Sequence, residues 1–251
     1  MKSVKWIAFS SQDRGTGTVV HFLPATPGAA TPYPVELSFT IFGRGIEKKT
    51  LAVEGARLFH PDGVKIESLF GIRPSDGDSS YGIEIDVFCS QARSDVSASQ
   101  CLIEFPLREG PLKFSPTRII LQDAIQKNEE DFIEYKEEKR RSILIKDALL
   151  SPSIVIVNSS AKDMRPEVYY SEIKNDEEVL QMIPLGQVAA QSVVERKLDS
   201  AFFNDVKPQE LSWGLVRSRS IMAVSNSESG VSYSVVFRDT KTSKITSVLS
   251  L

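Results

Sequence analysis

The chain has 251 residues, 41% of them hydrophobic, which is enough for one large core or for two domains of about 100 residues each. Its 30 basic and 33 acidic residues give a formal net charge of −3, without the basic surplus of a nucleic-acid-binding protein, so we expect no nucleic-acid partner. No stretch approaches the roughly 20 apolar residues of a membrane span, and the apolar part of the N-terminus is too short for a signal sequence. We therefore expect a soluble chain that is cytoplasmic as written, or periplasmic or secreted if a signal peptide has been removed.

Strand patterns dominate the first half of the chain. Residues 18–23 are β-branched and apolar, and residues 34–42 alternate apolar with polar side chains, which predicts a strand with one face in water. Short strands separated by frequent turns are typical of a β-sandwich or barrel. Further strands are predicted at residues 50–53, 56–59 and 64–70.

The second half repeats the first at an offset of 132 residues. A repeat of this length indicates a duplicated domain, because solenoid units are far shorter. The matching residues are Tyr81 with Trp213, Gly82 with Gly214, and Phe105 with Phe237. Strands of the second half are predicted at residues 153–157, 166–170, 180–185, 191–198, 213–217, 221–224 and 231–237, with an edge strand at 245–249.

The middle of the chain differs from both halves. Residues 122–141 contain no glycine or proline, are rich in helix formers, and carry acids early and bases late, which predicts a helix. Phe132, Ile133 and Tyr135 are the candidate partner-docking side chains of this segment, and a solvated linker is the alternative. Strands are expected on either side of it, at residues 117–121 and 142–145.

The expected fold is therefore all-β, with two tandem β-sandwich domains from an internal duplication and a charged, helical connecting segment. The domains span residues 1–116 and 148–251, and the connecting segment spans residues 117–147.

Catalytic and cofactor motifs are missing from the sequence. The chain has two histidines, and His21 and His60 are explained by a strand and a turn. No serine lies in a nucleophile elbow and no glycine-rich loop precedes a helix, so we expect no cofactor. Asp76 and Asp78 could offer oxygens to a calcium ion, although aspartates are also ordinary turn residues.

Two pairs of residues have both a structural and a functional interpretation. Cys89 and Cys101 could form a disulfide if their strands pair as a hairpin, or could be two buried thiols. Tyr81 and Trp213, each before a glycine, could stack on sugars, but their equivalent places in the repeat favour a shared structural role.

Residues 150–240 offer one resemblance. An apolar strand ends in Asn158, a tyrosine-rich strand follows, and an aromatic residue before Gly214 opens a strand before a polar turn. This pattern resembles the small β-sandwich proteins of the sensory rhodopsin transducer family. The resemblance implies a non-enzymatic, oligomeric binding module, and it carries no functional residues over.

We therefore expect a non-enzymatic protein that binds a protein or carbohydrate partner and could form a homo-oligomer. One alternative is a polysaccharide hydrolase or lyase that uses the sheet-face carboxylates Glu36, Glu84 and Glu104. The other alternative is a structural subunit of a surface or secretion assembly.

Overall fold

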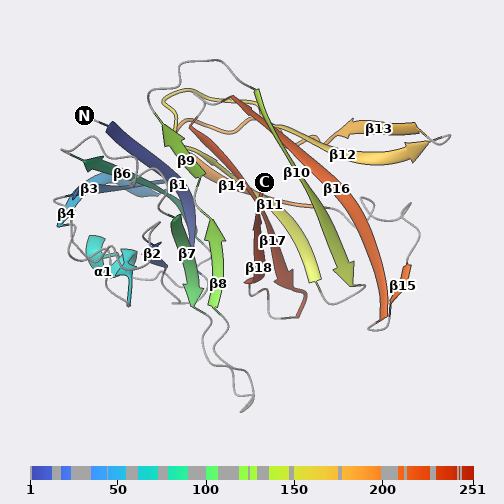
Figure 1. Cartoon of the computed structure of the whole chain (residues 1–251), viewed down its shortest axis with the longest axis horizontal. Coiled ribbons are helices and arrows are strands. Elements are labelled where there is room, and N and C mark those ends of the chain that lie inside the picture. Colours follow the sequence, from blue (N-terminus) through green and yellow to red (C-terminus); the bar gives the residue numbers. More distant parts are fainter. Residues whose placement is uncertain are drawn as a thin grey trace, which may run out of the picture. The chain divides into compact units, whose positions relative to one another are not determined.

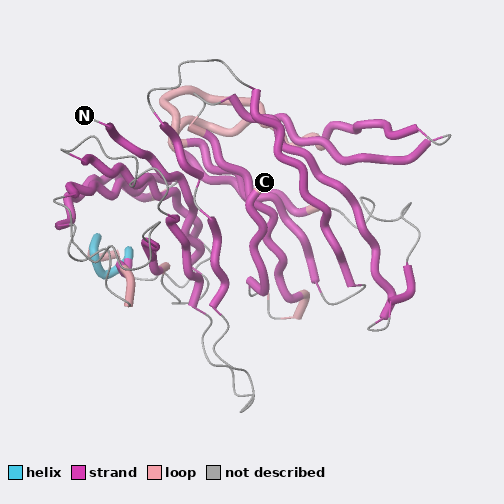
Figure 2. The backbone as a smooth tube through the Cα atoms, in the orientation of Figure 1, coloured by secondary structure: helices cyan, strands magenta, loops and turns pink. Residues whose placement is uncertain are grey.

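A computed structural model describes residues 2–12, 18–23, 35–43, 45–54, 62–72, 79–89, 100–106, 119–123, 125–128, 136–146, 150–174, 177–198, 209–211, 214–226, 230–241, 243 and 245–251. Strand dominates these residues (Figure 2), and the strands pair in antiparallel registers throughout both units, for example β1 with β6 and β11 with β17. The prediction of an all-β fold is confirmed. The chain forms two compact units, Met1–Ile133 with Gln191–Val193, and Glu134–Ala190 with Val194–Leu251.

The first unit contains two sheets among its described residues. One has the order β4-β3-β6-β1-β9, and the other has the order β5-β2-β7-β8 (Figure 1). The elements are β1 (Lys2–Gln12), β2 (Val19–Leu23), β3 (Val35–Gly43), β4 (Ile46–Glu54), β5 (Val64–Lys65), α1 (Ile66–Phe70), β6 (Ser79–Cys89), β7 (Gln100–Pro106), β8 (Ile119–Asp123) and β9 (Ile125–Asn128).

The second unit also contains two sheets among its described residues. One has the order β10-β16-β12-β13, with β15 paired to β16, and the other has the order β14-β11-β17-β18. The elements are β10 (Lys136–Lys146), β11 (Leu150–Asn158), β12 (Glu167–Lys174), β13 (Glu177–Met182), β14 (Ser192–Lys197), β15 (Gln209–Leu211), β16 (Gly214–Asn226), β17 (Val231–Asp239) and β18 (Ile245–Ser250).

Both units use the same strand order. If β1 to β8 are matched in sequence with β10, β11, β12, β13, β14, β16, β17 and β18, the order β4-β3-β6-β1 becomes β13-β12-β16-β10, and β5-β2-β7-β8 becomes β14-β11-β17-β18. This agreement of topology is what an internal duplication predicts. The edge strand expected at the C-terminus is present as β18.

The core of the second unit joins its two sheets. Ile154 and Val235 come from the sheet of β11 and β17, whereas Val168 and Ile221 come from the sheet of β12 and β16, and all four belong to one buried cluster. Alternation places every second side chain of a strand on this inner face. Two sheets that share one core in this way form a β-sandwich.

The segment predicted to be helical is a correction to the sequence analysis. Its described residues form β8, β9 and the start of β10, while Phe132, Ile133 and Tyr135 lie outside the described residues. β10 is an edge strand of its sheet, and charged side chains are common on edge strands because they discourage unwanted pairing. The charges that suggested a solvated helix therefore also suit an edge strand. The strands expected on either side of the segment are present as β8 and β10.

A second correction concerns residues 64–70, for which the pattern predicted one strand. Val64 and Lys65 form the short β5, and the chain then turns through α1. Ile66 and Phe70, four residues apart, are both buried, which is a helical spacing. Gly71 ends the helix with φ 67°, and its N–H donates to the carbonyl of Glu67, as glycine does at many helix C-termini.

Candidate functional site

Tyr81 is the centre of a buried polar cluster in the first unit. Its hydroxyl donates to Glu67 Oε1 at 2.6 Å, and the backbone N–H of Thr18 donates to Glu67 Oε2 at 2.8 Å. The Ser10 hydroxyl donates to Glu67 Oε1 at 3.2 Å and also bonds the Thr18 hydroxyl. The cluster joins β1, β6, α1 and the residue before β2, so that one carboxylate connects elements of both sheets.

Burial decides the role of Tyr81. Its side chain is 0% exposed, so its ring offers no surface for a sugar, and its contacts agree with the structural role that the repeat favoured. Burial, followed by the nearby negative charge of Glu67, raises the pKa of Tyr81 far above its ordinary value. The phenol therefore stays protonated and remains a hydrogen-bond donor.

Gly82, the glycine of the repeated motif, is explained by its cross-strand partner. Phe42 on β3 lies directly opposite Gly82 on β6. A Cβ atom on Gly82 would come within 2.3 Å of the Phe42 ring. The Phe42 ring thus occupies the space above the glycine.

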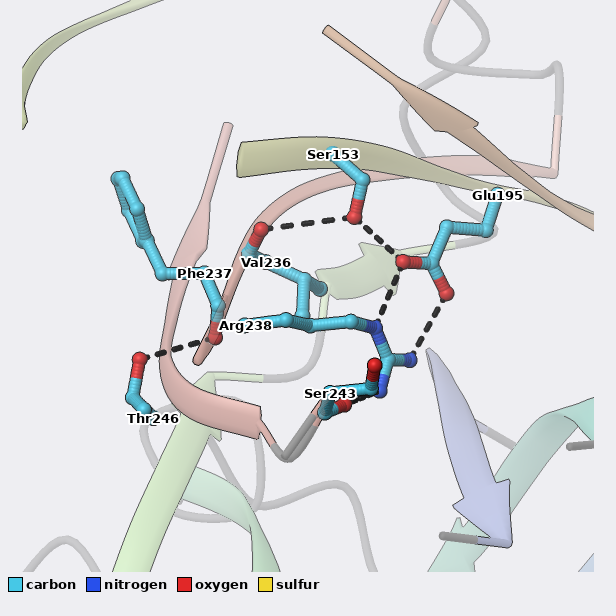
Figure 3. A network of polar contacts seen from close by, with 7 residues as sticks. All are labelled: Ser153, Glu195, Val236, Phe237, Arg238, Ser243 and Thr246. Carbon is cyan, nitrogen blue, oxygen red and sulfur yellow. Dashed lines mark hydrogen bonds and ion pairs between the residues drawn. The ribbon is translucent and has the colours of Figure 1, made fainter. Parts of the chain in front are cut away.

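The second unit has a polar cluster around Glu195 on β14 (Figure 3). Arg238 Nε and Nη2 each donate to a different oxygen of Glu195, both at 2.8 Å. The Ser153 hydroxyl donates to the same carboxylate, and Arg238 Nη1 donates to the Ser243 carbonyl at 3.0 Å. A fork of two parallel bonds fixes both groups in orientation. The cluster ties β14 and β11 to β17.

The charge state of Glu195 follows from this geometry. Burial alone would raise the pKa of Glu195, but the hydrogen bonds and positive charge of Arg238, helped by Ser153, bring it below its ordinary value. Both carboxylate oxygens accept hydrogen bonds from the protein. This is the arrangement of a structural ion pair and not of a catalytic base with a raised pKa.

A smaller pair occupies the corresponding sheet of the first unit. His21 Nε2 on β2 lies 2.5 Å from Glu104 Oε2 on β7, and both side chains are mostly buried. Gly63, with φ 63°, packs against the pair, because a Cβ atom there would come within 2.8 Å of the His21 ring. The backbone at Gly63 therefore needs glycine both for its conformation and for this contact.

The two polar pairs use different strands: His21 on β2 contacts Glu104 on β7, whereas Arg238 on β17 contacts Glu195 on β14, the counterpart of β5. In the first unit Glu104 is the diagonal cross-strand neighbour of His21. In the second unit Arg238 is the diagonal neighbour of Ser153 in the matching strands. In the first unit the basic side chain is His21 on β2, whereas in the second unit it is Arg238 on β17. The acid of the second unit is Glu195 on β14. The strand pairing is thus shared, whereas the residues that hold it together differ.

Strand β13 has a different character, because it combines an edge position with exposed apolar side chains. In the described residues it pairs with β12 alone. Leu180 is 42% exposed and Met182 is 61% exposed, and both point to the same face of the strand. Figure 1 shows the hairpin of β12 and β13 extending beyond the other strands of its unit. An edge strand of this kind can accept a further strand.

Several predicted site residues cannot be placed. The possible metal ligands, one of the paired aromatic residues and the docking side chains all lie outside the described residues: Asp76, Asp78, Trp213, Phe132, Ile133 and Tyr135. Among the residues that are described, no three histidine, cysteine, aspartate or glutamate side chains converge as a metal site would require.

The cysteines lie on strands that do not pair with each other. Cys89 ends β6, which pairs with β1 and β3, whereas Cys101 lies on β7, which pairs with β2 and β8. The hairpin on which a disulfide depended is therefore not formed. Cys101 is buried, and the side chain of Cys89 is outside the described residues.

Of the three sheet-face carboxylates, Glu36 and Glu84 lie on one sheet and Glu104 lies on the other. Glu84 lies on β6 and is buried beside its cross-strand neighbours Ile7 and Thr40, while Glu104 lies on β7 and bonds His21. The side chain of Glu36 is outside the described residues. Glu84 and Glu104 therefore come from different sheets.

Comparison with known proteins gives no family to which the chain can be assigned. No family model, no curated protein and no solved structure matches it. Within the described residues, no helix has the length and apolar composition needed to cross a membrane. What the fold defines is an all-β protein with an open sheet edge at β13.

Proposed function

We propose that this protein is a non-enzymatic interaction module that binds a protein partner along strand β13. The observation that carries the proposal is the pair of exposed side chains, Leu180 and Met182, on an edge strand. Edge strands offer a row of backbone donors and acceptors that an incoming strand can satisfy. Apolar side chains on the same strand add the contacts that give such pairing its affinity and specificity.

Two carboxylates support the choice of a non-enzymatic function, because both are already engaged in hydrogen bonds within the fold. The carboxylates of Glu67 and Glu195 each accept several hydrogen bonds from neighbouring strands. A protein partner is favoured over a carbohydrate because the exposed side chains are aliphatic, while sugars stack on accessible aromatic rings and Tyr81 is buried. The resemblance to the sensory rhodopsin transducer family points to the same class of function.

A peptide-display selection against the intact chain tests the proposal. We expect the enriched peptides to alternate apolar and polar residues, as a strand does. Their binding should weaken about tenfold or more in an L180T/M182T variant, because losing two apolar contacts of about 1 kcal/mol each corresponds to a factor of about 30. Threonine preserves the strand propensity of both positions.

The matched control is L249T. Leu249 is 36% exposed on β18, an edge strand of the other sheet in the same unit, so its substitution has the same chemistry at a different edge. The proposal would be overturned if the selected peptides bound L180T/M182T as tightly as they bind the natural chain. It would also be overturned if the L249T substitution weakened their binding as much as L180T/M182T does. Far-ultraviolet circular dichroism checks that each variant is folded.

A further inference from the structure

The counterpart of β13 in the first unit is β4, and it is also an edge strand. In the described residues β4 pairs with β3 alone, as β13 pairs with β12. The exposed side chains of the two edges differ in charge. β4 presents Lys48 and Lys49 beside the exposed Glu47, whereas the charged side chains that β13 presents are Glu177 and Glu178.

These charges match in one antiparallel register. If Lys48 is placed opposite Glu178, then Lys49 lies opposite Glu177 and Ile46 lies opposite the exposed Leu180. Opposite charges directly across a strand pair are stabilising, and like charges are destabilising. Two basic side chains thus meet two acidic ones, and an apolar residue covers part of the exposed surface of β13.

We propose that the partner of β13 is strand β4 of a second copy of this chain. The inference rests on the proposed function, because it uses the same edge of the same sheet. Pairing β13 with β13 would bring two acidic strands together. A contact between two different edges leaves one edge open on each outer copy, so it continues from copy to copy into a filament or closes into a ring.

Salt concentration should control this assembly. The lysines and the glutamates are exposed, and charges in water are screened over about 10 Å at 0.1 M salt. Glu178 also contacts Arg140 on β10 at 3.0 Å within the chain, so the incoming Lys48 shares this carboxylate with Arg140. Glu177 lies opposite Lys174 of β12 in the same chain, so both glutamates also have a basic neighbour within the chain.

Charge reversal tests the proposal. We expect the weight-average mass of the natural chain, measured by sedimentation velocity at low salt, to rise with protein concentration. The variants K48E/K49E and E177K/E178K should each lower the association constant roughly tenfold or more, because two attractive pairs become repulsive. An equimolar mixture of the two variants should assemble again, and so should one chain that carries all four substitutions.

A natural chain that stays monomeric at every concentration would overturn the proposal, as would a mixture of the two variants that fails to assemble. An R140Q variant that abolishes assembly as completely as E177K/E178K would also overturn it, because the effect would then come from the ion pair within the chain. If the chain is monomeric but selected peptides still bind β13, only the second copy as partner is wrong. If L180T/M182T changes neither peptide binding nor assembly, the proposed function fails as well.

Discussion

Replacing Tyr81 with phenylalanine removes one hydroxyl from the buried cluster and little else. The aromatic ring stays in place, so no cavity opens, but Glu67 Oε1 loses its 2.6 Å hydrogen bond and keeps only the 3.2 Å bond from Ser10. A hydrogen bond to a carboxylate contributes about 1.5–3 kcal/mol, and a buried acceptor left short of donors adds to the loss. We expect Tyr81→Phe to lower the free energy of unfolding of the first unit by about 2 kcal/mol.

Tyr233 in the second unit provides the matched control. It is also buried, and after burial the main influence on its pKa comes from the backbone of Glu167, which is neutral. Tyr233→Phe should therefore cost about 1 kcal/mol, the average for a neutral hydrogen bond. Because the chain has two compact units, local stability is best measured by hydrogen exchange followed separately in β6 and β17.

The reasoning would be refuted if Tyr81→Phe lowered the protection of β6 by no more than Tyr233→Phe lowers that of β17. It would also be refuted if a Glu67→Gln variant, which keeps the shape of the side chain, were as stable as the natural chain. Either outcome would mean that the carboxylate does not hold the sheets together.

Three further outcomes follow from the same contacts. Gly82→Ala should destabilise the first unit by about 1–3 kcal/mol, because its methyl group overlaps the Phe42 ring; urea denaturation of the variant measures this, and an unchanged midpoint contradicts it. The folded-state pKa of Tyr81 is raised above the ordinary 10.0. The stability that the Tyr81 phenol contributes is therefore complete below pH 10 and is lost as pH rises above that value. The free energy of unfolding measured on both sides of pH 10 should show this loss, and Tyr81→Phe should reduce the loss. The pKa of Glu195 lies below its ordinary 4.5. Its pairing with Arg238 therefore stabilises the second unit above that pH, and this stabilisation is lost as pH falls further. The free energy of unfolding should fall less steeply with decreasing pH in Glu195→Gln, and an unchanged slope would contradict the ion pair.

The two edge strands differ in their exposed side chains although the two units share one strand order. β4 and β13 occupy the same position in their sheets, yet one presents lysines and the other presents glutamates with Leu180 and Met182. Charges on an edge strand commonly prevent pairing. In the pairing proposed above, Lys48 and Lys49 of one copy meet Glu178 and Glu177 of another.

The sequence by itself determined that the fold is all-β and predicted several of its strands, because strand formation leaves a local periodicity. The alternation around Phe39 and the apolar run around Ile154 predicted β3 and β11. The repeat at 132 residues predicted two units that share one topology. The same local signals misassigned residues 122–141, since a charged segment without glycine suits a solvated helix as well as an edge strand. Only the pairing of β10 with β16 distinguishes the two.

Only the tertiary structure decided what the strands bring together. The face of β3 that was expected to lie in water is covered at Thr40 and Phe42, because burial depends on what packs above a strand and not on its own pattern. Glu195 meets Arg238 although 43 residues separate them. The exposure of Leu180 likewise depends on β13 being last in its sheet, and strand order is set by long-range pairing that no local pattern contains.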